Sequence, residues 1–197
     1  DFDPKAMLTM RGSDSGAAMT FDIGSSAAKF YSGHDNATTP VGSLPTFGLT
    51  SAADVTVAND AITKGATVAD VKTANVSADL PAWLQDANAA RAFLNDMQAV
   101  ARSMGRYYTS FSGYAGSTTD PKFTLVNGNA TLDGGAGLLI VTGNLVLNGN
   151  PSFNGVILVL GEGTVNRDGG GNGNIYGSIY VAKFARFQAT VAELRAP

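Results

Sequence analysis

The chain has 197 residues but no cysteine, a single histidine and only 15% charged residues. Without cysteine, disulfide bonds and thiolate metal sites are excluded. Lys and Arg number 13 against 16 for Asp and Glu, with no dense basic run, which argues against nucleic acid as the main partner. No apolar stretch reaches the ~18 residues that a membrane span requires. Highly charged and membrane-embedded classes of protein are therefore disfavoured.

In place of charge the chain has 24 glycines, and residues 123–182 alternate short apolar runs with turns of Gly, Asn and Asp. This stretch repeats itself. Residues 137–141 match 155–159 at an offset of 18, residues 153–159 match 175–181 at an offset of 22, and residues 125–129 match 140–144 at an offset of 15. Gly and Asn tolerate the backbone of tight corners, while β-branched residues favour extended chain. The stretch is therefore expected to form a series of short β-strands.

Two arrangements of these strands fit the repeats. Similar units at near-regular spacing favour a mainly β protein with a right-handed β-solenoid or β-helix-like core, in which each strand stacks on the next. Antiparallel hairpins are the alternative, because Asn148-Gly149 is typical of a type I′ turn. We favour the solenoid, because the repeated unit is a whole apolar run together with its turn.

Residues 79–105 predict one long amphipathic helix packed on this core. Asp79 can cap its start, Pro81 suits the first turn, and Gly105 suits the position just after its end. Apolar positions recur every three or four residues along it. The residues on this face are Leu84, Ala87, Leu94, Met97, Ala101 and Met104, with Trp83, Phe93 and Val100 widening it.

The remaining regions are less regular, and the chain is expected to form a single domain, residues 1–197. Residues 1–36 predict further strands, including 6–10, 19–23 and 29–31. Residues 37–78 are interpreted as an irregular insertion with a brief strand at 47–49 and one or two helical turns within 68–74.

Candidate chemical groups are few. His34 lies next to Ser32 and Asp35, but adjacent residues rarely converge into a catalytic triad, so a turn role is favoured. Glu162 and Asp168 flank a turn and could act as an acid–base pair, or they are surface charges at a corner.

A glycine-rich run at residues 168–174 is similar to calcium-binding repeats, but Ile175 stands where the acidic ligand belongs. A tight corner is the other interpretation of this run. We therefore expect no metal, no cofactor and no catalytic residue.

Four aromatic residues follow the predicted helix closely: Tyr107, Tyr108, Phe111 and Tyr114. They could stack on a sugar or on a partner protein, or they could pack the end of the helix onto the sheet. They are the candidate binding residues.

The glycine-rich segments at residues 135–149, 153–161 and 169–182 resemble the C-terminal repeats of PilX-like minor pilins of bacterial type IV pili. The resemblance covers about residues 123–182 and is faint elsewhere, at residues 30–36 and in the predicted helix. It implies an exported bacterial protein at the pilus or cell surface, whose N-terminal membrane and assembly helix precedes residue 1.

The resemblance implies a non-enzymatic structural and interaction domain that supports pilus assembly or adhesion. Expected partners are other pilins or cell-surface components, with carbohydrate or DNA as possible contacts. A carbohydrate-active β-helix enzyme or a polysaccharide-binding adhesin is the alternative function.

Overall fold

The computed structural model describes residues 3–12, 19, 30–34, 43–63, 67–68, 71–168 and 173–184. The chain divides into two compact units, unit 1 (residues 1–81) and unit 2 (residues 82–197), and each is described by itself.

Unit 1 contains short parallel strands and a helix. Its elements are β1 (Leu8–Arg11), β2 (Phe30–Tyr31), β3 (Phe47–Leu49), α1 (Ala52–Ile62), β4 (Thr67–Val68), β5 (Thr73–Asn75) and the 3₁₀ turn η1 (Ser77–Asp79). Strands β1, β3 and β5 pair in parallel in the order β5-β3-β1, and β2 pairs in parallel with β4. The predicted strands at 6–10, 29–31 and 47–49 correspond to β1, β2 and β3, whereas 19–23 lies almost wholly outside the described residues.

Helix α1 connects the parallel strands β3 and β5, which makes a β-α-β crossover. The Oγ of Ser51 caps the helix by accepting from the backbone N–H of Asp54 at 3.1 Å, and it donates to the Asp54 carboxylate at 2.8 Å. Residues 52–62, predicted as irregular, are therefore helical, and the helical turns expected within 68–74 are replaced by extended chain at β5.

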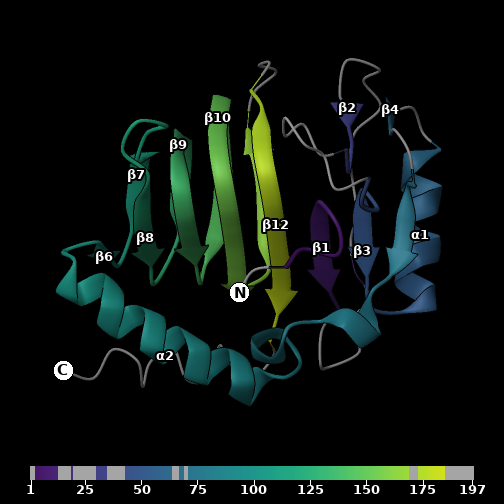
Figure 1. Ribbon diagram of the computed structural model, residues 1–197, viewed down its shortest axis with the longest axis horizontal. Coiled ribbons are helices and arrows are strands. Elements are labelled where there is room, and N and C mark those ends of the chain that lie inside the picture. Colours follow the sequence, from purple (N-terminus) through teal and green to yellow (C-terminus); the bar gives the residue numbers. More distant parts are fainter. Residues whose placement is uncertain are drawn as a thin grey trace. The chain divides into compact units, whose positions relative to one another are not determined.

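Unit 2 is built on longer parallel strands. Its elements are η2 (Ala82–Leu84), α2 (Ala87–Ser103), β6 (Tyr107–Tyr108), β7 (Phe111–Ala115), β8 (Lys122–Val126), β9 (Ala130–Val141), β10 (Asn144–Gly161), β11 (Thr164–Asp168) and β12 (Ile175–Lys183). The main path runs β12-β10-β9-β8-β6, with β7 on β9 and β11 on β10 (Figure 1). Strand β9 pairs with β7 through its first half and with β8 through its second half.

The repeat offsets of the sequence are confirmed as strand registers. Strands β8 and β9 pair at an offset of 15, from Lys122 opposite Gly137. The second halves of β9 and β10 pair at 18, as in Gly137 opposite Gly155, and β10 pairs with β12 at 22, as in Gly155 opposite Gly177. The pairings of β7, β8 and β12 with β9 or β10, and of β9 with β10, are parallel, so the hairpin alternative is wrong.

The predicted fold class, a β-solenoid with one long helix, is also wrong. The described chain is a predominantly parallel-strand structure with two α-helices, α1 and α2, and is α/β-like. The prediction failed because residues 37–78 were treated as an insertion. Parallel strands need crossover connections, and α1 provides one within that region.

Helix α2 is shorter than predicted at its start and ends as predicted. Asp86, not Asp79, is its N-cap, with the carboxylate accepting from the backbone N–H of Asn88 and of Ala89 at 2.8 and 2.9 Å. Gly105 follows the helix with a left-handed φ of 66°. No helix among the described residues is long and apolar enough to span a bilayer.

Helix α2 packs on the strands of unit 2 and passes across their ends in Figure 1. Leu84, Leu94 and Ala101 are buried as predicted, but Met104 is 55% exposed and does not belong to the packed face. The Trp83 ring stacks on Phe93 at 4.9 Å and meets Tyr180 of β12 edge-on at 5.5 Å. These aromatic contacts join the helical segment to the sheet.

The core of unit 2 consists of columns of residues paired in register on neighbouring strands. One column is Leu125, Ile140, Leu158 and Tyr180, and the column beside it is Val126, Val141 and Val159; all are buried. Because consecutive residues point to opposite faces of a strand, both faces are covered here. The near-continuous apolar runs noted in the sequence follow from this burial.

Candidate functional site

The four aromatic residues predicted as a binding cluster come from β6 and β7. Tyr108 and Phe111 meet edge-on, with ring centroids 5.3 Å apart, and the Arg106 guanidinium lies 5.6 Å from the Tyr108 ring centroid. The Arg102 guanidinium lies over Tyr107 at 3.8 Å. Three of the four therefore make contacts internal to unit 2, as the packing interpretation expects, and their role in binding stays a prediction.

Tyr107 also belongs to a polar chain that enters the core. Its hydroxyl accepts from Nδ2 of Asn127 at 3.1 Å, and Oδ1 of Asn127 accepts from the Thr142 hydroxyl at 3.0 Å. Asn127 is only 3% exposed and Thr142 is 6% exposed. The amide of Asn127, just after β8, therefore bonds to a half-buried hydroxyl from β6 and to a buried hydroxyl just after β9.

We expect Asn127→Ala to lower the free energy of unfolding by about 1–3 kcal/mol, because the buried Thr142 hydroxyl and the half-buried Tyr107 hydroxyl both lose their partner. Urea denaturation measures the change. Asn95→Ala, at an exposed position of α2, is the control and should shift stability by no more than about 0.5 kcal/mol. Equal effects of the two substitutions on the free energy of unfolding would contradict a structural role for this chain of hydrogen bonds.

Tyr114 differs from the other three because its side chain is 71% exposed. Its register position is opposite Gly134, which is opposite Ser152 on β10. Tyr176, 53% exposed, is opposite Asn154, two residues further along β10. By register the two tyrosines therefore lie on the same side of the strands, three strand spacings apart (about 14 Å) across the strands and two residues apart (about 7 Å) along them. Small residues at positions 134 and 136 separate them.

Sequence analysis did not single out Tyr176. The offset of 22 in the sequence does predict its register position opposite Asn154. Its exposure could not be read from the offset alone.

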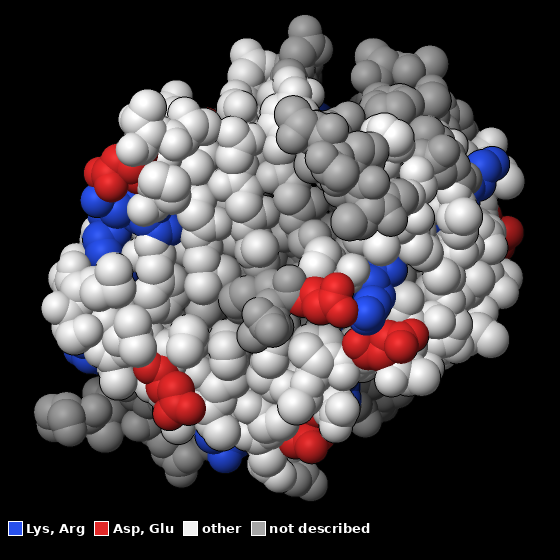
Figure 2. All heavy atoms as spheres, viewed as in Figure 1, with Lys and Arg blue, Asp and Glu red and all other residues white. Residues whose placement is uncertain are grey.

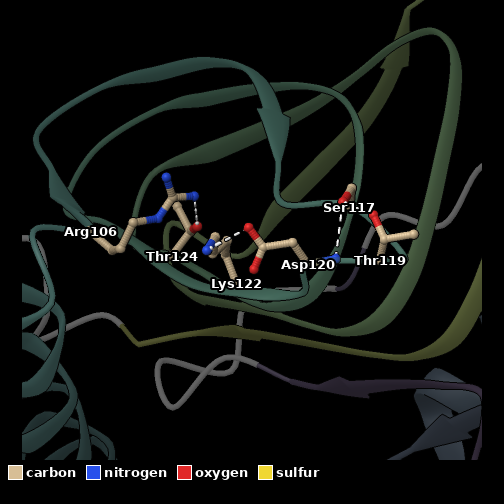
Figure 3. Close-up of polar contacts among 6 residues, drawn as sticks. All are labelled: Arg106, Ser117, Thr119, Asp120, Lys122 and Thr124. Atoms are coloured by element: carbon tan, nitrogen blue, oxygen red, sulfur yellow. Dashed lines mark hydrogen bonds and ion pairs between the residues drawn. The ribbon is translucent and has the colours of Figure 1, made fainter.

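A second group of polar residues lies at the turn between β7 and β8, within β8 and just before β6 (Figure 3). Lys122 and Asp120 form an ion pair at 2.7 Å, and the Asp120 backbone N–H donates to the Ser117 hydroxyl at 3.1 Å. Nη2 of Arg106 donates to the buried hydroxyl of Thr124 at 2.7 Å. Among the residues that the structure describes, no carboxylate pairs with Arg106, and its buried Nε has no acceptor. Sequence analysis did not single out Arg106 or Lys122.

The other candidate residues are dispersed. His34 is exposed, and its backbone N–H donates to the Ser32 hydroxyl at 3.0 Å, while Nδ1 lies 3.3 Å from the Ser43 hydroxyl. Asp35 is outside the described residues. Glu162 precedes β11 and Asp168 ends it, so the extended strand β11 separates the two carboxylates along the chain. Their action as an acid–base pair stays an alternative.

The calcium-like run cannot be placed, because residues 169–172 lie outside the described part of the chain. Across the described residues, no group of three or more His, Asp or Glu side chains could hold a metal ion.

Comparisons of the chain with protein-family models, with curated proteins and with solved structures found no match.

Proposed function

We propose that this chain is a non-enzymatic structural and interaction domain of a type IV pilus minor pilin or a related bacterial surface protein. It would act outside the cell, in pilus assembly or in adhesion, with other pilins or cell-surface components as partners. Its role is to present exposed side chains and edges on a rigid support.

The observation that supports this proposal most is the coincidence of the pilin-like repeats with strand register. The resemblance covers about residues 123–182, and strands β8 to β12 in that range pair at the repeat offsets. The repeated residues therefore serve a scaffold that fixes the positions of exposed groups. Surface loops and edges on such a scaffold are where recognition residues commonly lie.

A polysaccharide-binding adhesin is a second candidate, favoured by the placement of Tyr114 and Tyr176. Exposed aromatic faces on one side of a sheet can stack on sugar rings. Binding of the purified chain to an insoluble polysaccharide, lost in the double variant Tyr114→Ala/Tyr176→Ala, would favour this function over pilin contacts.

The proposal is tested in cells that depend on this protein for surface attachment. We expect Tyr114→Ala/Tyr176→Ala to reduce attachment at least several-fold while the melting temperature stays within a few degrees, because both side chains are mainly exposed. Val71→Ala, at another exposed apolar position, is the matched control and should leave attachment unchanged.

An enzymatic role would be revealed by the purified chain itself. We expect no turnover of acidic polysaccharides. Turnover that Glu162→Gln or Asp168→Asn abolishes would overturn the non-enzymatic proposal.

A further inference from the structure

Strand β7 forms one end of a line of parallel strands, β7-β9-β10-β11. Among the described residues, β7 has a strand partner only on the side of β9. The Phe111 N–H donates to the Asn129 carbonyl at 3.2 Å, which directs it toward β9. Because backbone groups alternate in direction along a parallel strand, the N–H and C=O of Ser112 face the open side.

The glycine pattern marks the same side as a place for another strand. Gly135 and Gly155 have φ of 139°, and a Cβ at either would meet the backbone of the strand that precedes it, at Ala115 and Gly137. Gly113 has a similar φ of 125°, yet a Cβ there would meet no heavy atom within 4 Å. In the inner strands, this backbone conformation allows the close approach of a neighbouring strand. Strand β7 has the same conformation at Gly113.

The two ends of this line of strands differ in their protection. Soluble proteins commonly place charges or proline on exposed sheet edges to prevent pairing with other chains. Strand β11 at the far end carries Arg167 and Asp168, both exposed. Strand β7, Phe-Ser-Gly-Tyr-Ala, has neither charge nor proline. The β7 edge is therefore the unprotected one.

Three basic and two acidic residues lie near the end strands β6 to β9. Arg102, Arg106 and Lys122 are basic, Asp120 pairs with Lys122, and Asp133 of β9 accepts from Asn148, while the whole chain carries a net charge of −3. Figure 2 shows basic groups beside one acidic group at the side where Figure 1 places β7 and β8. Arg106 has no carboxylate partner among the described residues. The end of the sheet at β7 therefore favours an acidic ligand.

We propose that the open edge of β7 binds an extended acidic segment of a partner protein as an added β-strand. Backbone hydrogen bonds to Ser112 supply the pairing, as in other cases of strand addition. A carboxylate of the segment pairs with Arg106 and fixes its position along the edge. The inference does not depend on the pilus function, because it concerns the purified chain and any segment of this chemistry.

Fluorescence anisotropy with a labelled heptapeptide, Thr-Val-Thr-Val-Asp-Val-Asp, tests the proposal. We expect the peptide to bind the full chain, and Ser112→Pro to weaken binding at least ten-fold, because proline removes the outward N–H. Ser112→Ala keeps that N–H and should bind as the wild type does. Arg106→Gln, or replacement of both peptide aspartates by lysine, should also weaken binding at least ten-fold.

Hydrogen exchange on the wild-type chain provides a readout that needs no variant. Bound peptide should slow exchange of the Ser112 amide and leave that of Phe111 unchanged, since Phe111 is already bonded to Asn129. Binding that is equal for Ser112→Ala and a folded Ser112→Pro, or protection at residues remote from β7, would overturn the proposal. So would the absence of binding up to about 1 mM peptide.

Discussion

Replacement of Gly155 by alanine is expected to lower the free energy of unfolding by about 3–6 kcal/mol, or to prevent folding of unit 2. Gly155 has a φ of 139°, which alanine adopts only with strain. Its Cβ would also fall on the carbonyl oxygen of Gly137 in the neighbouring strand. That atom belongs to the backbone of a paired strand, so it cannot move aside without loss of the register.

The same arrangement recurs across the sheet. Gly137, Gly155 and Gly177 form one in-register column, and a Cβ at Gly177 would fall on the carbonyl of Gly155. Each glycine therefore permits the close approach of the strand that precedes it. This close approach explains why glycine is present at the same place in each repeat.

Gly149→Ala is the matched control for this prediction. Gly149 also has a left-handed backbone, with a φ of 60°, but a Cβ there would meet nothing within 4 Å. Its substitution should cost only the conformational term, about 1–2 kcal/mol. Thermal or urea denaturation of both variants measures the difference, and equal losses of stability would show that crowding by Gly137 is unimportant.

The second large effect is expected for Leu94→Ala, which should destabilise the protein by about 2–5 kcal/mol. Leu94 is 3% exposed and lies in the middle of α2, on the face that packs against the sheet of unit 2. Truncation removes apolar contacts and leaves a cavity, because the helix is held by Trp83 and by the strands that it contacts.

Met104→Ala provides the comparison, since Met104 stands on the same predicted face but is 55% exposed. Its substitution should change stability by less than about 0.5 kcal/mol. Equilibrium denaturation in urea resolves both values. A loss below 0.5 kcal/mol for Leu94→Ala would mean that α2 does not pack on the sheet in solution.

Part of the candidate site was accessible from the sequence. The aromatic residues at 107–114 were visible, but the strand that carries Tyr114 was not, because β7 pairs with β9 at offsets of 19 and 20, as in Phe111 opposite Ala130 and Tyr114 opposite Gly134, and the sequence repeats do not show these offsets. The sequence did not show which members of the aromatic cluster make internal contacts and which are exposed, because those contacts are with distant residues. Arg102 covers Tyr107 from α2, and Asn127 reaches the same ring from beyond β8.

The exposed edge of β7 also required the structure. Its sequence, Phe-Ser-Gly-Tyr-Ala, resembles that of an inner strand, and only the pairing pattern shows that one side lacks a strand among the described residues. Likewise, Arg106 follows the end of α2 in sequence, but its bond to Thr124, 18 residues later, depends on β6 and β8 lying side by side.

Strand register was determined by the sequence itself. Repeated glycines and apolar runs specify register because a shift by one residue would place apolar side chains on the wrong face and side chains where glycine is needed. The end of α2 at Gly105 was likewise local, since the left-handed residue after a helix is a property of the chain at that point.

The fold class was decided by tertiary structure. Helix α1 has a capping signal at Ser51 and Asp54, but three of its 11 residues are buried and its apolar face is weak, so local pattern did not reveal it. What stabilises it is packing beside β3 and β5, strands that are 24 residues or more apart in sequence. A crossover of this kind gains its free energy from contacts between distant segments, and only the folded chain contains those contacts.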